Sequence, residues 1–313
     1  MRSAVIDLGS HTFHAVVADV DAVGVRRVVF DRKIAARVGD LAYRDSAALI
    51  RDDAYAHALA AIVELVARTR PRAPERVRVI ATGVFRDADN GAQLLADAAD
   101  RCGLPIELLD ARDEARLAWL GVSAELAGSH GRLAVIDLGG GSLELACGDA
   151  CVDVAHGLPL GALRLRALAP IAIRQHVAAL AGSALDEVRA SVPDTVALAS
   201  GTARALLALA RRQAVVGVIQ RHVCTRTFVE LARRLAPLSR DAIAALGVPQ
   251  ARTDTIAAGA TAIAAVLEQL GRPVTYVARG GLRDGALVEM ARTHTRSEEV
   301  AEASPSRRTS RVA

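Results

Sequence analysis

Two short stretches of the sequence combine an aspartate with glycine and serine in a way that suits phosphate chemistry. Asp7 is followed by Gly9 and Ser10, and the six residues AVIDLG that contain it recur letter for letter around Asp137. The second copy continues as Gly139, Gly140, Gly141 and Ser142. Glycines let the backbone approach a ligand closely, so that N–H groups and a hydroxyl can bind phosphate oxygens. Because a carboxylate repels phosphate, each aspartate makes chemical sense if a divalent cation or a water molecule lies between them.

The repeat also predicts how the chain is organised. Each copy is a β-branched apolar run, a tight polar turn and a second alternating run, which is the pattern of two strands joined by a turn. The spacing of the copies suits a duplicated domain rather than a solenoid. A single turn of this kind is more often structural, whereas two copies favour function. Facing loops would place both carboxylates across one cleft, where they could grip a phosphate chain and a metal from both sides.

Periodicity and capping residues predict further elements in both halves. In the first half we expect strands over 23–36, 77–81 and 106–109, and helices over 52–68 and 87–102. In the second half we expect strands over 152–156, 195–199 and 274–277, and helices over 171–189, 202–211, 225–235, 253–270 and 282–292. The polar sequence from Thr293 onward is expected to fray.

Four polar clusters follow predicted strands or open predicted helices. Thr82 and Arg86 lie in ATGVFRD, where a helix N-terminus and a guanidinium could bind an anion, although the aspartate of this string could simply cap the helix. Glu114, in ARDEARL, is expected near the cleft, yet acidic residues are common in any first helical turn. Gly201 and Thr202, in ASGTAR, and the string ARGGLRDG repeat the arrangement of strand, turn and helix. None of the four identifies a site alone.

Taken together, these strings resemble a known family. The segments VIDLGSHTFH, ATGVFRDADN, ARDEARLAWLGV, VIDLGGGSLEL, LPLGALRL, SGTARALLALA, TDTIAAGA and GGLRDG are similar, in order and spacing, to the motifs of the exopolyphosphatase and guanosine pentaphosphate phosphohydrolase family, Ppx/GppA. The resemblance runs from Asp7 to about Gly285. It implies an α/β fold in which two duplicated actin-like, RNase-H-like domains of the acetate and sugar kinase superfamily flank a cleft. The implied domains are residues 1–123 and 124–292, followed by a flexible polar tail at 293–313.

The resemblance also implies roles for individual residues. It makes Glu114 the general base that takes a proton from the attacking water, and it assigns Asp7, Asp137 and Glu144 to a divalent cation. The implied phosphate ligands are Gly9, Ser10, His11, Thr82, Arg86, Gly139, Gly140, Gly141, Ser142, Gly201 and Thr202. Mg²⁺ or Mn²⁺ is the implied cofactor, with K⁺ as a further candidate. Electrostatic clamping and an oriented water are most of what phosphoryl transfer needs.

The sequence departs from the family pattern at four points. His11 stands where the family usually has asparagine, which would make phosphate binding depend on pH. Gly83 replaces a serine that could donate a hydrogen bond, and Asp113 replaces the first glutamate of the usual EEAR pair. The chain also ends where two actin-like domains would end, without the C-terminal helical domain of longer members. We therefore expect lower processivity or a preference for shorter polymers.

Composition disfavours several other classes of protein. With 313 residues and 52% hydrophobic residues, the chain can bury one large core or two ordinary ones. No apolar run is long enough to span a membrane, and the N-terminus lacks the layout of a secretory signal. Aromatic residues make up 3%, which gives little to stack on nucleic-acid bases. We therefore expect a cytoplasmic protein that binds neither nucleic acid nor membrane, and the family resemblance adds a homodimer as a further expectation.

The expected activity is release of terminal orthophosphate from inorganic polyphosphate by a metal-dependent phosphohydrolase. Guanosine pentaphosphate is the alternative substrate, which the motifs do not separate, although the scarcity of aromatic residues favours polyphosphate. An ATP-dependent phosphotransferase would share the fold but lacks an acceptor-site signature here. A non-catalytic sensor of guanosine tetra- or pentaphosphate is the alternative from a different class. The four retained carboxylates argue against it, because a binder has no need of a base aimed at water.

Overall fold

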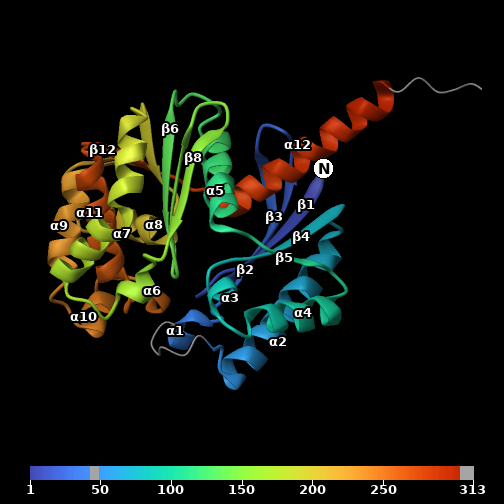
Figure 1. The fold of residues 1–313 in the computed structure, drawn as a ribbon, viewed down its shortest axis with the longest axis horizontal. Coiled ribbons are helices and arrows are strands. Elements are labelled where there is room, and N and C mark those ends of the chain that lie inside the picture. The colour runs from blue at the N-terminus through green and yellow to red at the C-terminus, as the bar shows by residue number, and fades with distance from the viewer. Residues whose placement is uncertain (43–48, 304–313) are drawn as a thin grey trace, which may run out of the picture.

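The two halves of the sequence fold into two α/β units that lie side by side (Figure 1). The structure is a computed structural model that describes residues 1–42 and 49–303. Strands β1, β2 and β3 and strands β6, β7 and β8 form the facing parts of the two sheets, with helices between and around them.

Five strands form the sheet of the first half. They are β1 (Arg2–Leu8), β2 (Phe13–Val20), β3 (Val25–Ile34), β4 (Arg76–Ala81) and β5 (Ile106–Leu108), in the spatial order β3-β2-β1-β4-β5. Strands β1, β2 and β3 pair antiparallel, whereas β1, β4 and β5 run parallel. Central strand β1 is covered on both faces, with Val5 and Ile6 completely buried, which explains its unbroken apolar run.

The second sheet repeats this topology. It contains β6 (Leu133–Leu138), β7 (Leu143–Gly148), β8 (Val152–Leu158), β9 (Thr195–Leu198), β10 (Val218–Ile219), β11 (His222–Cys224) and β12 (Val274–Val277). Starting from β8, the order is β8-β7-β6-β9-β12, with the same strand directions as in the first sheet, and β11 and β10 are added at the edge. The predicted duplication of an α/β domain is therefore confirmed.

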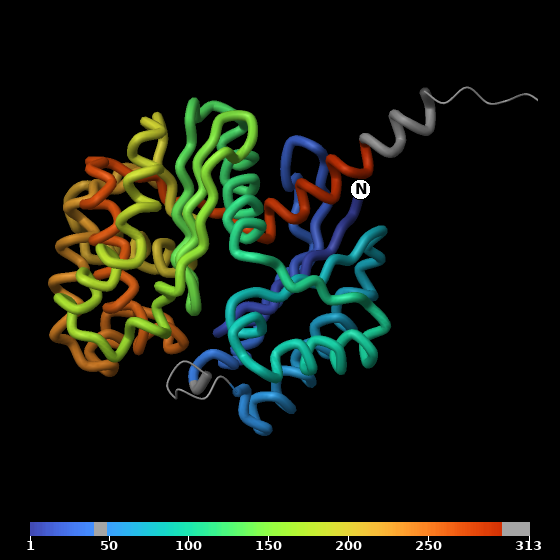
Figure 2. Tube along the Cα trace, viewed as in Figure 1, coloured from blue at the N-terminus to red at the C-terminus, as the bar shows by residue number. Residues whose placement is uncertain are grey.

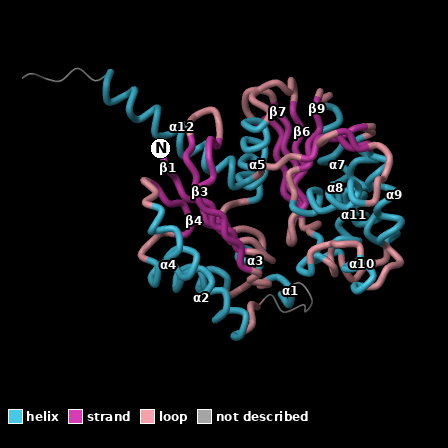
Figure 3. Tube along the Cα trace, turned by 180° about the vertical axis from the view of Figure 1, so that it is seen from behind, coloured by secondary structure: helices cyan, strands magenta, loops and turns pink. Residues whose placement is uncertain are grey.

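Helices cover the faces of both sheets. In the first half they are α1 (Gly39–Ala42), α2 (Asp52–Thr69), the 3₁₀ helix η1 (Arg70–Arg72), α3 (Val84–Asp87) and α4 (Gly91–Cys102), and Figure 3 shows α2 and α4 together on one side of the sheet. In the second half they are α6 (Ala162–Leu165), α7 (Pro170–Ala190), α8 (Gly201–Arg212), α9 (Thr225–Leu235), α10 (Arg240–Ala245), η2 (Gln250–Arg252) and α11 (Ile256–Leu270). None of the helices in the described ranges is both long and apolar enough to cross a membrane.

Two further helices connect the halves. Helix α5 (Ala111–Glu125) follows the first sheet but packs against β6, β7 and β8, and helix α12 (Leu282–Ala303) follows the second sheet but packs against β1, β2 and β3. Figure 2 shows α12, in red, crossing from the second half to the N-terminal strands. Each connecting helix therefore lies on the sheet of the other half. The predicted division of the chain at residues 123 and 124 stays a prediction.

Helices α5 and α12 pack against each other with almost no space between their backbones. A Cβ on Gly121 of α5 would collide with the carbonyl oxygen of Gly281, and a Cβ on Gly285 of α12 would collide with the carbonyl oxygen of Leu117. Only glycine allows so close an approach at these two positions. This crossing is therefore a close backbone contact between the two helices that connect the halves.

The structure differs from the predicted elements at several boundaries. The helix expected over 87–102 is divided into α3 and α4, because Ala88 between them has an extended backbone. Helix α11 begins at Ile256 instead of 253, since the 3₁₀ helix η2 precedes it. Helix α12 continues to Ala303, beyond the point where fraying was expected, and residues 304–313 lie outside the described residues. The short β10 and β11 were not predicted, because two or three residues carry no detectable periodicity.

Candidate active site

A cavity of about 170 Å³ lies between the two halves, at the carboxyl ends of β1, β4, β6 and β9. This end of parallel strands is where α/β sheets usually bind ligands. Of the residues predicted from sequence, the cavity is lined by Asp7, Gly9, Ser10, Thr82, Glu114, Asp137, Gly139, Gly140, Gly141, Ser142, Glu144 and Gly201. The fold thus brings together the predicted base, the three predicted cation ligands and most of the predicted phosphate ligands.

A second cavity of about 160 Å³ adjoins the first and shares glycines of both phosphate loops with it. It adds two predicted residues, His11 and Thr202. Nε2 of His11 is buried and has no hydrogen-bond partner among the described residues, while Nδ1 lies 3.4 Å from Oδ1 of Asp40. An imidazole with one unpaired nitrogen can donate to an anion here, as the usual asparagine would.

The two phosphate loops have the same backbone geometry. The N–H of Gly9 donates to the carbonyl oxygen of Thr12 at 3.3 Å, and the N–H of Gly139 donates to that of Ser142 at 2.9 Å. Each bond closes the turn between two antiparallel strands. The same hydrogen bond therefore closes the turn in each half, although residues 10–12 and 140–142 differ in sequence, and loops of both halves line the cavity.

The residues that pair with the two aspartates across these hairpins differ. Asp137 of β6 is opposite Glu144 of β7, whereas Asp7 of β1 is opposite His14 of β2. Burial lowers the pKa of His14 to about 3, so this imidazole is neutral, and its Nε2 lies 3.0 Å from Oδ1 of Asp31. Only the second half therefore adds another carboxylate to its loop, which makes the cavity asymmetric.

Four carboxylates line the first cavity, and burial raises the pKa of each of them: Asp7, Glu114, Asp137 and Glu144. For Glu144, the neighbouring Glu114 and Asp137 raise the pKa further. Oε1 of Glu144 is also buried with no hydrogen-bond partner among the described residues. Carboxylates so close together repel each other when ionised, and a bound cation would relieve that repulsion.

Glu114 lies in the first turn of α5. Asp110 caps this helix by accepting a hydrogen bond from the N–H of Asp113 at 2.8 Å. The cap directs Glu114, which is 4% exposed, to the cavity, whereas the side chain of Asp113 pairs at 3.1 Å with Arg116. Burial raises the pKa of Glu114 to about 7, against the lowering effect of the adjacent Arg86. A carboxylate that titrates near neutral pH suits a general base.

Arg86 lines neither cavity but contacts the predicted base. Its Nη1 donates to Oε1 of Glu114 at 2.6 Å and to the carbonyl oxygen of Leu109 at 2.7 Å. Its predicted role as a phosphate clamp stays a prediction. Gly83 lies nearby with φ of 53°, and a hydrogen bond from its backbone to Glu114 also lowers the pKa of that carboxyl group. Glycine in place of serine therefore suits the backbone of this turn.

Three arginines at the two cavities were not among the predicted site residues. Nη1 of Arg283 donates to Oδ2 of Asp7 at 2.7 Å, and Nη1 of Arg204 donates to the carbonyl oxygens of Ala199 at 2.7 Å and Arg279 at 3.1 Å. The guanidinium of Arg252 has no hydrogen-bond or ionic partner among the described residues. Burial lowers the pKa of both Arg204 and Arg252. These cations therefore provide positive charge for an anionic ligand.

The sequence contained a signal for two of these arginines. Arg204 and Arg283 stand in SGTAR and GGLRDG, each just after a strand of the second sheet. Arg252 belongs to η2, which no sequence pattern connects with the site, and its side chain packs over the backbone of Gly201.

Ion pairs between the halves close the mouth of the cleft. Arg164 pairs with Asp87, and Nη1 of Arg166 lies 3.2 Å from Oδ1 of Asp40 and 3.5 Å from Oδ2 of Asp254. Asp40 and Asp87 belong to the first half and both arginines to the second. These pairs therefore connect the two halves next to the second cavity, where Asp40 also lies 3.4 Å from His11.

The donor set of the cavity fits a cation that binds together with phosphate. Within residues 1–42 and 49–303, no three His, Cys, Asp or Glu side chains are placed to hold a metal by themselves. Mg²⁺ usually keeps several waters and takes only one or two carboxylates together with substrate phosphates. The unpaired oxygen of Glu144 and the buried carboxyl groups of Asp7 and Asp137 match that requirement.

The chain is similar to proteins of one family. The model of the Ppx/GppA phosphatase family matches residues 16–294. Exopolyphosphatase 1 of Mycobacterium tuberculosis H37Rv is 27% identical over 325 residues, which cover 94% of this chain and 93% of the relative. Exopolyphosphatase 1 of Mycobacterium leprae is 33% identical over 166 residues, which cover 53% of this chain and 48% of the relative.

Solved structures share the fold. An exopolyphosphatase from Cytophaga hutchinsonii has a TM-score of 0.81 at 20% identity, covering 94% of this chain and 98% of its own. The Aquifex aeolicus Ppx/GppA family member has a TM-score of 0.73 at 22% identity, covering 97% and 99%. The family model, the full-length relatives and the shared two-part fold agree. The chain therefore belongs to the Ppx/GppA phosphatase family and is a hydrolase that acts on phosphoanhydride bonds.

Proposed function

We propose that this enzyme removes the terminal orthophosphate from inorganic polyphosphate and depends on a divalent cation. The observation that carries the proposal is the buried carboxyl group of Glu114, with a pKa of about 7, in a cavity bordered by two phosphate loops. The similarity to proteins named exopolyphosphatase supports the choice of substrate.

The shape and lining of the cavities support a phosphate chain over a nucleotide. The two cavities are small, about 170 and 160 Å³, and share loop residues, so they form a continuous narrow space. Among the described residues, no Phe, Tyr or Trp lines either cavity, so guanine would have only the imidazole of His11 to stack on. In our proposal the terminal phosphate lies beside Glu114 and the following phosphates extend toward His11 and Arg252. Guanosine pentaphosphate carries phosphates that suit the same loops and is the comparison substrate.

Asp7, Asp137 and Glu144 would hold Mg²⁺ or Mn²⁺ jointly with the phosphate oxygens of the substrate. All three offer hard oxygen donors, which both ions accept. When bound, the ion neutralises phosphate charge and lowers the pKa of water. A role for K⁺ stays a prediction.

The residues of the chain perform the remaining steps. Glu114 in its ionised form accepts a proton from the water whose oxygen bonds to the terminal phosphorus. The bond from this phosphorus to its bridging oxygen breaks, and the shortened polyphosphate leaves with the electron pair. Arg204, Arg283 and the N–H groups of the two loops neutralise charge that builds on the phosphoryl oxygens. Arg86 holds the base in position through its hydrogen bond at 2.6 Å.

The test is orthophosphate release by the purified protein with Mg²⁺, from long polyphosphate, short polyphosphate and guanosine pentaphosphate. Glu114→Gln should lower turnover by about 100-fold or more, which is the usual contribution of a general base, and should leave substrate binding intact. Asp113→Asn is the matched control, because it neutralises the adjacent carboxylate that points away from the cavity. Removal of the cation with a chelator should abolish release.

Each other outcome contradicts a defined part of the proposal. If Glu114→Gln retains turnover, Glu114 is not the general base. If orthophosphate is released faster from guanosine pentaphosphate than from either polymer, guanosine pentaphosphate is the preferred substrate. Binding of all three without release by the native protein makes a sensor the better description.

Location and assembly are part of the proposal too. We place the enzyme in the cytoplasm, because its four cysteines are all free, the state that a reducing compartment maintains. A homodimer stays a prediction, which light scattering coupled to size-exclusion chromatography would check.

A further inference from the structure

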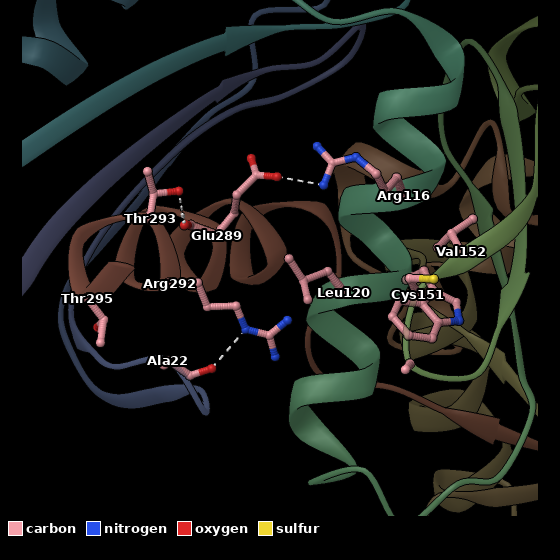
Figure 4. A pocket seen from close by; sticks show the side chains of 11 residues that line it. Ala22, Arg116, Leu120, Cys151, Val152, Glu289, Arg292, Thr293 and Thr295 are labelled. Carbon is pink, nitrogen blue, oxygen red and sulfur yellow. Dashed lines mark hydrogen bonds and ion pairs between the residues drawn. The ribbon is translucent and has the colours of Figure 1, made fainter. Parts of the chain in front are cut away.

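A cavity larger than either catalytic cavity lies outside the catalytic site. It has a volume of about 610 Å³, within the range typical of small-molecule sites. Figure 4 shows Ala22, Arg116, Leu120, Cys151, Glu289 and Arg292 around it, and we call it the hinge pocket. A neighbouring cavity of about 380 Å³ shares Trp119, Ala150 and Arg292 with it. None of these residues lines the catalytic cavities.

The strand topology puts the hinge pocket at the opposite ends of the two sheets from the phosphate loops. Ala22 lies in the turn that follows β2, and Cys151 lies in the turn that follows β7. Both strands run away from the catalytic loops, and β7, with six residues, spans roughly 20 Å. Helices α5 and α12 form the base of the pocket between these turns (Figures 1 and 4).

This position couples the pocket to the catalytic cleft. The catalytic cavity lies at the carboxyl ends of β1 and β6, the hinge pocket lies at the turns that follow β2 and β7, and residues of α5 and α12 line both. A rotation of the halves about the crossing that separates Asp40 from Arg166 would bring the turns of Ala22 and Cys151 closer together. A molecule held between these turns therefore resists opening of the cleft.

The apolar part of the lining suits a flat or aliphatic body. Trp119 and Leu120 of α5, which packs on the second sheet, and Val152 of β8 line the pocket on one side, and Ala22 lines it from the first sheet. The indole nitrogen of Trp119 already donates to the carbonyl oxygen of Leu133 at 3.0 Å. The ring itself thus needs no polar partner from a ligand.

The charged part of the lining offers one guanidinium for an anion. Glu289 of α12 accepts hydrogen bonds from Arg116 at 2.5 Å and from Arg78 at 2.7 Å, and Arg116 also pairs with Asp113 at 3.1 Å. Arg78 also pairs with Glu107 at 2.8 Å, so both arginines of this cluster are already matched by carboxylates. Arg292 differs, because Nε donates to the carbonyl oxygen of Ala22 at 2.9 Å and no carboxylate among the described residues pairs with it. In Figure 4 its guanidinium points into the space between α12 and α5.

We propose that the hinge pocket binds a small organic carboxylate, with an aromatic or aliphatic body against Trp119 and Leu120 and its carboxylate on Arg292, and that this ligand restrains opening of the catalytic cleft. A planar carboxylate matches a single guanidinium in shape and charge, whereas a doubly charged phosphate would leave one charge unpaired. The ligand contacts both halves, so its binding energy depends on the angle between them, as a regulatory site requires.

Binding can be measured without any substrate, because Trp119 is the one tryptophan of the sequence. The probe is 4-nitrobenzoate, whose nitro group quenches indole fluorescence. We expect quenching that saturates with concentration and that is not relieved by orthophosphate. The neutral analogue nitrobenzene should bind about tenfold more weakly, since it lacks the charged hydrogen bonds to Arg292.

Two variants control the assignment. Arg292→Gln removes the proposed anion partner and should weaken 4-nitrobenzoate binding about tenfold or more. Ala150→Phe places a ring at the shared wall of the two outer cavities and should block the probe while leaving the anion partner in place. Quenching that increases linearly with 4-nitrobenzoate and is equal in the native protein and in both variants would overturn the site.

The coupling is tested by small-angle scattering and by phosphate release. Saturating 4-nitrobenzoate should decrease the radius of gyration of the substrate-free protein and change the KM or kcat of phosphate release by about fivefold or more, the lower end of usual coupling between sites. Both effects should disappear in Arg292→Gln. Saturable binding with no change in either quantity would overturn the coupling. The measurement of phosphate release rests on the proposed function, whereas quenching and scattering do not. Failure of the proposed function can therefore be distinguished from failure of the proposed binding site.

Discussion

Arg86 and Glu114 form an ion pair at the edge of the catalytic cavity, with 2.6 Å between Nη1 and Oε1. The same nitrogen of Arg86 also donates to the carbonyl oxygen of Leu109. This bond holds the guanidinium against the connection between β5 and α5, the helix that contains Glu114. Burial raises the pKa of Glu114, and the charge of Arg86 opposes this effect. Burial and this ion pair together therefore determine the pH at which Glu114, the proposed base, becomes ionised.

The first prediction is a pH dependence set by this pair. Phosphate release should increase as pH rises through about 7, because only the ionised form of Glu114 can accept a proton. Arg86→Gln removes a charge that lowers the pKa of Glu114, so the inflection should move to higher pH. A move of about one unit would decrease the rate at pH 7 by about fivefold.

Profiles of kcat/KM against pH measure this effect. Arg112→Gln is the control, since Arg112 is an exposed neighbour on the same helix. An inflection at the same pH in Arg86→Gln and in the native enzyme would show that Arg86 does not tune the base.

The second prediction concerns stability. The folded protein holds the proton of Glu114 up to about pH 7, whereas the unfolded chain loses it near the ordinary value of 4.5. The contribution of this group to stability is therefore complete below about pH 4.5 and is lost as pH rises through about 7. Glu114→Gln imitates the protonated form, so at about pH 8 the variant should be more stable than the native enzyme by on the order of 1–3 kcal/mol.

Urea unfolding at about pH 5 and 8 checks this prediction. The increase in the free energy of unfolding of Glu114→Gln should be large at the higher pH and small at the lower one. The control Asp113→Asn, whose side chain is about half exposed, should show no such difference. An equal gain at both values would mean that the charge of Glu114 is not the cause.

The repeated phosphate loop made much of the fold predictable. The segment around Asp7 and its copy around Asp137 have the same six residues, and the same local sequence forms the same strand and turn. The strand order that follows from duplication was therefore accessible from sequence. Glu114 was accessible too, because a helix cap and a family motif place it in a first turn.

The remaining features depend on packing between distant segments. Arg252 reaches the second cavity because η2 folds back onto Gly201, and no local pattern encodes that contact. The crossing of α5 and α12 depends on Gly121 and Gly285, which within a helical pattern look like ordinary unfavourable residues. Only the assembled structure shows that each faces a backbone carbonyl of the other segment.

The third prediction assigns a binding role to Arg283. This residue donates to Asp7 at 2.7 Å and lines the catalytic cavity. Arg283→Gln should increase the KM for polyphosphate about tenfold or more, because charged hydrogen bonds to the substrate are lost. It should also raise the pKa of Asp7 further, since Arg283 lowers it. Steady-state kinetics at several pH values, with Arg279→Gln as the control, measure this change in KM. An equal KM in the two variants would contradict a binding role for Arg283.

The fourth prediction concerns closure of the cleft. Asp40 of the first half lies 3.2 Å from Nη1 of Arg166 in the second half, and the backbone oxygen of Asp40 accepts a further hydrogen bond from Arg166 at 2.7 Å. Asp40→Asn removes the charge of this interaction, so open conformations should become more populated. Scattering should show a larger radius of gyration in the absence of substrate. KM should rise several-fold, because a partly buried ion pair contributes on the order of 1 kcal/mol. Asp53→Asn is the control, because it neutralises an exposed carboxylate that pairs with Arg51 in the same half. Identical scattering of the two variants would rule out this role of Asp40.

The fifth prediction tests the helix crossing directly. Gly121→Ala places a Cβ against the carbonyl oxygen of Gly281, where neither backbone can move without disturbing α5 or α12. The free energy of unfolding should fall by about 2 kcal/mol or more, as for other overpacked cores. Gly182→Ala in α7 is the matched control, because no atom lies within 4 Å of its added Cβ. Alanine there should stabilise the helix by about 0.5–1 kcal/mol. Thermal unfolding of the two variants should therefore give shifts of opposite sign, and a shared sign would show that the effect of Gly121 is helix propensity rather than contact between the helices.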